Sequence, residues 1–277
     1  MATIDINRVA NRVAACGRTA SDVCTGNMVS FWMAPHHVEY EYHVRNVRAD
    51  DATSSDIARQ IYQNVQGCPL SDARQLLEAL IAQGVRRADI IDKHIPTVAR
   101  RLGQNWENSD LSFANVTIAC GHLQTLLAEA DRDIRNLSEI DPPRATLLLI
   151  IRAREHHTLG GFVTASRLRR AGLAVRVLLH ESDTRIHQEL QMTPYDVVVF
   201  SSSRPQDIDA ISDLAVSSRT QHDALFALSG LVLDLHPNLR LREPPPGLDI
   251  VTNDLDDLRA CCDRWCRADD QLRRVSA

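Results

Sequence analysis

The residues best suited to chemistry in this chain are Glu155, His157 and Gly160, which stand in that order between an apolar stretch and a helical pattern. A histidine in a strand-to-helix loop can offer one ring nitrogen to the metal of a large planar cofactor. An acid two residues earlier can fix the tautomer of that ring, and a glycine lets a cofactor approach the backbone closely. The run from 155 to 160 therefore predicts a metal-cofactor site, and the alternative is an ordinary polar loop.

Two later loops carry small residues at comparable positions. Ser201 and Ser203 follow the third predicted strand, and Ser229 and Gly230 follow the fourth. Small residues at neighbouring strand ends leave a slot in which hydroxyl groups can bond a polar ligand tail. Gly230 and the glycine of the first loop remove side chains where a bulky group must approach. We therefore expect the three loops to form one site.

The elements that must position these loops alternate between strand and helix. Apolar runs of strand length cover 145–151, 173–179, 196–200, 224–228 and 249–252. Helical patterns lie between and after them, at 161–170, 184–192, 206–218 and 254–267. This alternation predicts right-handed βαβ units and an α/β, flavodoxin-like (Rossmann-like) parallel sheet. Ligands of such sheets bind at the carboxyl ends of the strands, where the run from 155 to 160 falls.

An upstream stretch has helical periodicity throughout. Its first helix has Leu76, Leu77, Leu80 and Ile81 on one face and closes at Gly84. A second helix covers 89–102 with an apolar face formed by Ile90, Ile91, Ile95, Val98 and Leu102. A long third helix starts at the N-cap Ser112, with Val116, Ile118, Leu123, Leu126 and Leu127 as its apolar residues. These helices predict a small bundle.

The domain boundaries follow from these patterns. Pro142-Pro143 ends the bundle. We therefore expect an N-terminal extension over 1–67, partly helical or disordered, a helical bundle over 68–141 and the α/β domain over 144–270. In the extension, His36, His37 and His43 could reach a metal, but a mobile or docking segment is the favoured interpretation.

Composition limits the partners. The 277 residues carry a formal net charge of −5, which argues against a large electrostatic footprint for nucleic acid. A membrane span is not expected, because no run of about 18 apolar residues occurs. The N-terminus lacks the order of a secretory signal, so we expect a cytoplasmic protein with reduced thiols. Cys261, Cys262 and Cys266 therefore indicate packing more than metal binding.

The three loops resemble the cobalamin-binding domain. Its signature is Asp-x-His-x-x-Gly, then Ser-x-Leu about forty residues later, then Gly-Gly some twenty-five further on. Here 40 residues (161 to 200) separate Gly160 from Ser201, and 25 (204 to 228) separate Ser203 from Ser229. Each motif carries one substitution, because Glu155 replaces the aspartate, Ser203 the leucine and Ser229 the first glycine.

This resemblance implies cobalamin as the cofactor and leaves its adenosyl, methyl or hydroxo form open. His157 would be the lower axial ligand of cobalt and would displace the dimethylbenzimidazole base. Glu155 would orient the imidazole, and the displaced nucleotide tail would run beside Ser201, Ser203 and Gly230. The implied cofactor contacts in these loops are Glu155, His157, Thr158, Leu159, Gly160, Ser201, Ser203, Ser229 and Gly230. His156, one residue off the motif, is expected to face solvent.

The helical stretch also carries a resemblance. Residues 101–106 and 110–112 are similar to the bundle that covers the upper corrin face in cobalamin-dependent photoreceptors and corrinoid proteins. Trp106 would pack there over the upper ligand, or else belong to the bundle core. CarH-type photoreceptors have a Glu-His pair where this chain has Val116 and Thr117. They also have a DNA-binding helix-turn-helix that we do not find in residues 1–60. These differences argue against adenosylcobalamin chemistry of the CarH kind.

Glu-x-His-Thr-Leu-Gly at 155–160 and Leu-Ser-Phe-Ala-x-Val-Thr at 111–117 most resemble the AerR/PpaA group of purple photosynthetic bacteria. The resemblance covers about residues 70–252. It implies a cobalamin-binding, light-responsive antirepressor, without enzymatic activity, that contacts a PAS-domain repressor of photosynthesis genes and does not bind DNA itself. The alternatives are a corrinoid methyl carrier of a methyltransferase system, or haem or flavin in the same slot.

Overall fold

A computed structural model describes residues 51–66, 73–137, 145–219, 223–241 and 243–263. These residues fall into two compact units, one ending at Asn136 and the other beginning at Leu137. Several predictions concern residues outside the described ranges: those on the extension histidines, on Cys266 and on the Pro142-Pro143 boundary. None of the helices in the described ranges is long and apolar enough to cross a membrane.

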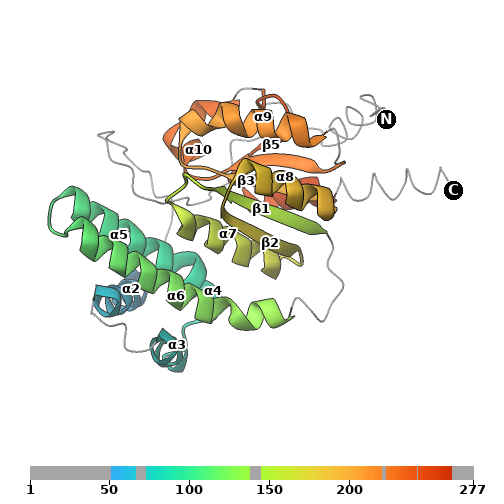
Figure 1. Cartoon of the computed structure of the whole chain (residues 1–277). Helices are drawn as coiled ribbons and strands as arrows, with labels where there is room; N and C mark the ends of the chain where they lie inside the picture. The colour runs from blue at the N-terminus through green and yellow to red at the C-terminus, as the bar shows by residue number, and fades with distance from the viewer. Residues whose placement is uncertain (1–50, 67–72, 138–144, 220–222, 242, 264–277) are drawn as a thin grey trace. The chain divides into compact units, whose positions relative to one another are not determined.

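The first unit is helical (Figure 1). It contains α2 (Asp51–Gln66), α3 (Ala73–Ala82), α5 (Ile95–Glu107) and α6 (Phe113–Leu137). A short helix α4 (Arg87–Asp89) and a π-helical segment η1 (Ile90–His94) lead directly into α5. The helices predicted from periodicity are therefore present, and the second one continues beyond the predicted residue 102.

Two helix ends carry the capping hydrogen bonds that their local sequence predicts. The N–H of Gly84 donates to Ile81 O (2.8 Å) and that of Val85 to Leu80 O (3.1 Å), which is a Schellman motif. Gly84 adopts φ +85°, a conformation that favours glycine. At the start of α6, Ser112 Oγ accepts from the N–H of Asn115 (3.2 Å), so Ser112 is the cap that the sequence predicts.

The buried faces of these helices are narrower than predicted. Ile81 is 36% exposed and Ile118 is 43% exposed, although the sequence places both on apolar faces. Leu76, Leu77 and Leu80 are buried in α3, and Val116, Leu123 and Leu126 are buried in α6. Periodicity identifies the direction of a buried face but not its width, which depends on what packs against the helix.

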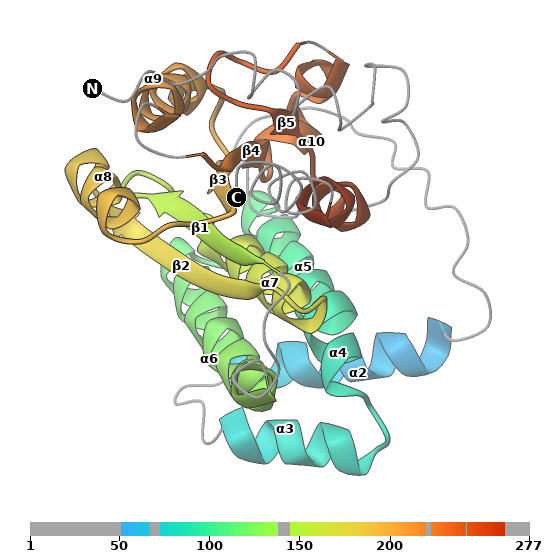
Figure 2. The same cartoon turned by 90° about the vertical axis from the view of Figure 1, so that its right-hand side faces the viewer.

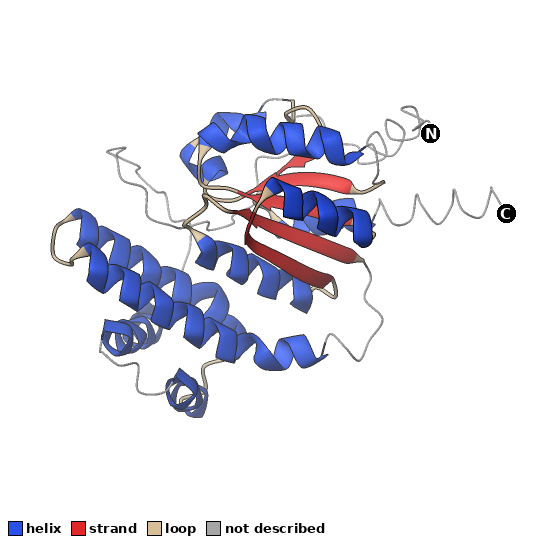
Figure 3. Ribbon diagram, in the orientation of Figure 1, coloured by secondary structure: helices blue, strands red, loops and turns tan. Residues whose placement is uncertain are grey.

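The second unit is a five-stranded parallel sheet with helices on both faces (Figures 2 and 3). Its strands are β1 (Thr146–Arg152), β2 (Ala174–Glu181), β3 (Val197–Ser201), β4 (Leu225–Ser229) and β5 (Ile250–Val251). The order is β2-β1-β3-β4-β5, the doubly wound order of flavodoxin-like sheets. The predicted α/β fold is therefore confirmed, and all five predicted strands are present within a few residues.

Alternate residues of the central strands enter two different cores. Leu148, Ile150 and Phe200 pack with helices α8 (Asp183–Met192) and α9 (Ile208–Arg219). Leu147 and Leu149 pack on the opposite face with α7 (Thr158–Arg170) and the helical residues 255–263. Because β1 is buried on both faces, its sequence is a continuous apolar run and not an alternating one. Cys261 and Cys262 belong to the second core, as the packing interpretation predicts.

Three features differ from the sequence prediction. Helix α7 begins at Thr158 and not at residue 161, so Thr158, Leu159 and Gly160 form its first turn. A 3-10 turn η2 (Pro205–Asp207) precedes α9. After β4 the chain forms a short helix α10 (Val232–Leu235) and a 3-10 segment η3 (Pro237–Leu241), which are too short to show helical periodicity.

Candidate functional site

The candidate site lies at the carboxyl edge of the sheet. Ile151 of β1 is paired with Ser201 of β3, and Ser201 is paired with Ser229 of β4. The loops that follow these three strands therefore begin side by side at the same edge of the sheet. This is the edge at which open parallel sheets bind their ligands.

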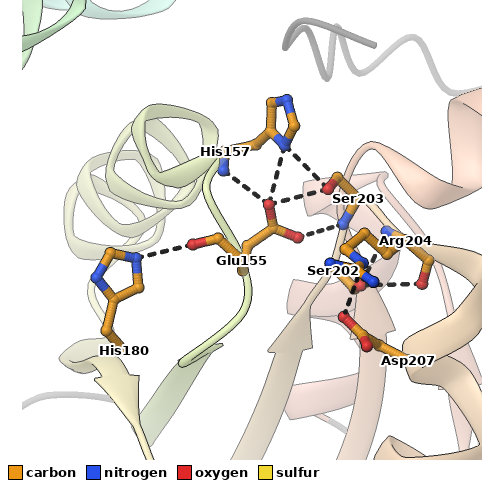
Figure 4. Close-up of polar contacts among 7 residues, drawn as sticks. All are labelled: Glu155, His157, His180, Ser202, Ser203, Arg204 and Asp207. Atoms are coloured by element: carbon orange, nitrogen blue, oxygen red, sulfur yellow. Dashed lines mark hydrogen bonds and ion pairs between the residues drawn. The ribbon is translucent and has the colours of Figure 1, made fainter. Parts of the chain in front are cut away.

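Glu155 is the buried centre of this edge, with 2% of its surface exposed. Its Oε1 accepts from the N–H of His157 (2.7 Å) and from the hydroxyl of Ser203 (2.9 Å). Its Oε2 accepts from the N–H of Ser203 (2.6 Å) (Figure 4). The carboxylate therefore joins the loop after β1 to the loop after β3.

The environment of Glu155 favours the ionised form. Burial acts most strongly and by itself raises the pKa of this carboxyl group. Hydrogen bonds from the side chain and backbone of His157, and from the backbone and hydroxyl of Ser203, lower it. Together they outweigh burial, and the pKa of Glu155 lies below its ordinary value. Glu155 is therefore a carboxylate at neutral pH.

That carboxylate fixes the tautomer of His157. The ring nitrogen Nδ1 lies 3.1 Å from Glu155 Oε1 and 3.0 Å from Ser203 Oγ (Figure 4). A carboxylate can only accept, so the hydrogen-bond network assigns the proton to Nδ1. The neutral ring then has its lone pair on Nε2, the atom at the far end of the ring from Glu155. The side chain is 24% exposed, so the imidazole reaches the surface.

Ser229 and Gly230 form a separate cluster around Asn253, a residue with 3% of its surface exposed. The Oδ1 of Asn253 accepts from Ser229 Oγ (3.0 Å) and from the N–H of Gly230 (2.7 Å). Its Nδ2 donates to Gly230 O (3.0 Å). Asn253 therefore fixes the loop after β4, as Glu155 fixes the loop after β1.

Gly230 is also approached closely by the backbone of a neighbouring loop. Its φ is +113°, and a Cβ at this position would lie 2.4 Å from Ser202 O and 2.8 Å from Ser202 N. The N–H of Ser202 donates to Ser229 O (3.0 Å), and that of Val232 donates to Ser202 O (3.0 Å). The neighbouring loop of the chain itself therefore approaches Gly230, a contact that the sequence does not show, and the predicted contact with a cofactor stays a prediction.

The remaining predicted site residues are placed as follows. Thr158 and Leu159 are buried and Gly160 is partly buried, all three in the first turn of α7. His156 is exposed, as expected. Trp106 belongs to the helical unit, where its ring centroid lies 6.4 Å from that of Phe113. The cofactor contacts predicted for Thr158, Leu159, Gly160 and Trp106, and those predicted for the other residues of the three loops, remain predictions.

Sequence reasoning missed two residues that hold the site. Asn253 follows β5 without any local motif, so only its contacts with Ser229 and Gly230 reveal it. His180 lies at the end of β2, and its ring contacts the backbone carbonyl of Glu155 (Figure 4). Neither residue type at such a position predicts a role by itself, and both become apparent only once the strands are paired.

The fold and site together define an α/β protein that holds a carboxylate-bound histidine at the carboxyl edge of its parallel sheet. No protein-family model matches the chain. It is 29% identical over 182 residues to an uncharacterized 20.5 kDa protein in the bchF-crtJ intergenic region of Rhodobacter capsulatus. The match covers 65% of this chain and 93% of that protein.

Among solved structures, the chain is similar to the Methanosarcina barkeri monomethylamine corrinoid protein, with a TM-score of 0.57 and 15% identity. That similarity covers 77% of this chain and 97% of the other, and it shows a shared fold. A cobalamin-binding protein from Desulfitobacterium hafniense DCB-2 matches with 14% identity over 76% of this chain and 98% of its own. Its TM-score of 0.37 is too low to support an argument.

Proposed function

We propose that this chain binds cobalamin and regulates photosynthesis genes through a protein partner, without catalysing a reaction of its own. The observation that carries the proposal is the geometry of His157. Its Nδ1 donates to a buried, ionised carboxylate, and the ring stands at the ligand-binding edge of the sheet. A histidine that ligates a metal commonly donates its other ring N–H to a carboxylate in this way.

The residues at this edge fit cobalamin in chemical type. His157 would ligate cobalt through Nε2, and Glu155 and Ser203 would hold the ring in the required tautomer. Ser201, Ser229 and Gly230 line the same edge, where the nucleotide tail would run. When bound in its adenosyl or methyl form, cobalamin would supply a cobalt–carbon bond that light can break. The fold shared with a corrinoid protein supports this cofactor.

Two observations support a regulatory role. The Rhodobacter capsulatus relative is described by its place in the bchF-crtJ intergenic region, which agrees with the AerR/PpaA resemblance. The net charge of −5 favours a protein partner over direct contact with DNA. The partner that we propose is a PAS-domain repressor of photosynthesis genes. The affinity of this chain for the repressor would change when light alters the upper ligand of cobalt.

The ligand assignment is tested by the visible spectrum of the full chain loaded with hydroxocobalamin in the dark. His157→Ala should abolish the spectrum of histidine-coordinated cobalt. His156→Ala is the matched control, because His156 is the exposed neighbour on the same loop, and it should leave the spectrum unchanged. An unaltered spectrum in His157→Ala would refute the assignment, and a positive pyridine haemochrome assay on the purified protein would identify haem instead.

The regulatory role is tested by co-purification with a PAS-domain repressor. The alkylcobalamin-loaded chain, kept in the dark or illuminated, should differ in the amount of repressor that it retains on size-exclusion chromatography. Equal retention in both states would leave cobalamin binding intact but would refute the light-dependent contact.

A second candidate function is corrinoid methyl carriage, which the fold shared with the monomethylamine corrinoid protein favours. A methyl carrier must cycle its cobalt through a reduced, nucleophilic state. Incubation of the reduced holo-protein with methylamines and a cognate methyltransferase would then produce methylcobalamin on the chain. Formation of that product would favour the carrier over the sensor.

A further inference from the structure

The end of β2 contains an irregularity that places His180 beside the candidate site. Ile151 of β1 lies opposite Leu179, and Arg152 lies opposite Glu181, so His180 has no opposite residue. The backbone of His180 adopts φ +56°. Bulges are uncommon between parallel strands, and a residue other than glycine in this conformation is uncommon as well. Such departures from regular geometry concentrate near functional sites.

The bulge directs the ring of His180 to the loop after β1. Its Nε2 lies 2.8 Å from the backbone carbonyl oxygen of Glu155 (Figure 4). A carbonyl oxygen only accepts, so Nε2 carries the proton and donates. The N–H of Glu155 donates in turn to Arg152 O (3.0 Å). Both backbone groups of Glu155 are thus engaged, and its carboxylate is engaged by Ser203 on the opposite side.

We propose that His180 is a positioning residue for His157, acting through the backbone of Glu155. The glutamate side chain is long, and where its carboxylate lies depends on the backbone from which it extends. Glu155 is held by β2 through His180 and by the β3 loop through Ser203, on the two sides of β1. Loss of the His180 contact would let Glu155 shift and would weaken its hold on Nδ1 of His157.

Three substitutions of His180 separate this role from a purely structural one. In His180→Gln the side-chain amide nitrogen takes roughly the place of Nε2 and can still donate to the carbonyl. In His180→Asn the side chain is shorter, so its amide nitrogen lies near the place of Nδ1 and cannot reach the carbonyl oxygen of Glu155. Backbone strain predicts the opposite preference, because asparagine and glycine accept a positive φ better than glutamine does. His180→Gly removes the donor and relieves the strain together.

The readout is the tautomer of His157, measured by 15N NMR of the imidazole in the cofactor-free full chain. Wild type and His180→Gln should hold the proton on Nδ1. In His180→Asn and His180→Gly the ratio of Nδ1–H to Nε2–H should fall about fivefold, the effect expected from one lost hydrogen bond. Glu181→Gln, a change at the neighbouring residue of β2, is the control and should leave the ratio unchanged.

Rescue by glutamine but not by asparagine supports the inference. An unchanged ratio in all three His180 variants, or a glutamine variant that behaves like the glycine variant, would overturn it. The inference rests on the proposed function only in its second readout, the pH at which His157 releases cobalt in the holo-protein. That pH should rise in His180→Gly. If the wild-type chain shows no histidine-coordinated cobalt, the proposed function fails, while the tautomer still decides the role of His180.

Discussion

At the scale of single residues, Glu155 shows how a buried carboxylate is kept charged. Desolvation opposes ionisation, but donors from two loops compensate for it. Hydrogen bonds to a charged group contribute about 1.5–3 kcal/mol each. The ionised Glu155 in turn accepts from Nδ1 of His157 and so determines which ring nitrogen is protonated. The charge of Glu155 and the ligand capacity of His157 therefore depend on one another.

Replacing the carboxylate by an amide tests this dependence. In Glu155→Gln only one oxygen remains, and the amide group must face at least one of the donors that the carboxylate accepted. We expect the free energy of unfolding to fall by about 2 kcal/mol, measured by urea denaturation. Glu107→Gln changes an exposed glutamate and should stay within about 0.5 kcal/mol of wild type. Equal effects of the two changes would contradict the role of Glu155.

The difference in free energy of unfolding between wild type and Glu155→Gln should depend on pH in a direction that the pKa of Glu155 sets. The folded-state pKa of Glu155 lies below its ordinary value of 4.5, so its contribution to stability is present in full above that value. The contribution is lost as the pH falls through the lower, folded-state pKa. Urea denaturation between pH 7 and pH 3 should therefore show the gap between wild type and Glu155→Gln narrowing below about pH 4.5. A gap independent of pH would show that the charge is not involved.

At the scale of elements, two glycines with positive φ allow the cost of backbone strain to be distinguished from the cost of a steric clash. Gly84 (φ +85°) has no atoms within 4 Å of the position of a Cβ, whereas Gly230 (φ +113°) faces the backbone of Ser202. We expect Gly84→Ala to lower the free energy of unfolding by about 1–2 kcal/mol, from strain alone. Gly230→Ala should lower it by about 3 kcal/mol or more, because the clash adds to the strain.

Urea denaturation measures both changes, and amide hydrogen exchange measures their local effect. In Gly230→Ala the exchange of the Ser202 amide, which donates to Ser229 O, should accelerate. Equal costs of the two substitutions would mean that the loop after β3 moves away freely. The contact between the two strand-end loops would then not hold the site in place.

At the scale of the whole molecule, the proposed ligand links cofactor binding to stability. A ligand that binds only the folded chain stabilises it by mass action, by about 2.7 kcal/mol when it is present at 100 times its Kd. Differential scanning calorimetry with hydroxocobalamin in the dark should therefore show a higher Tm for wild type and for His156→Ala. The increase should be much smaller for His157→Ala. A full increase in that variant would mean that cobalamin binds without His157.

Much of the fold could be predicted from the sequence because its central strands are buried. Strands β1, β3 and β4 are covered on both faces, so each one is a short apolar run that stands out in the sequence. Helix ends at Gly84 and Ser112 carry their own signals. The exposure of Ile81 and Ile118 escaped prediction because local periodicity carries no information on what packs against a helix. The short helix α10 escaped it because four residues are too few to show a helical period.

The sequence alone determined the acid, the histidine and the order of the elements, because these are local properties of adjacent residues. The tertiary structure decided which groups hold them. Ser203 lies 48 residues from Glu155, His180 lies 25 residues from it, and Asn253 lies 23 residues from Gly230. Each contact depends on strand order and on where each strand ends, and for His180 also on the bulge in β2. These features arise only when distant segments pack together, so no local pattern encodes them.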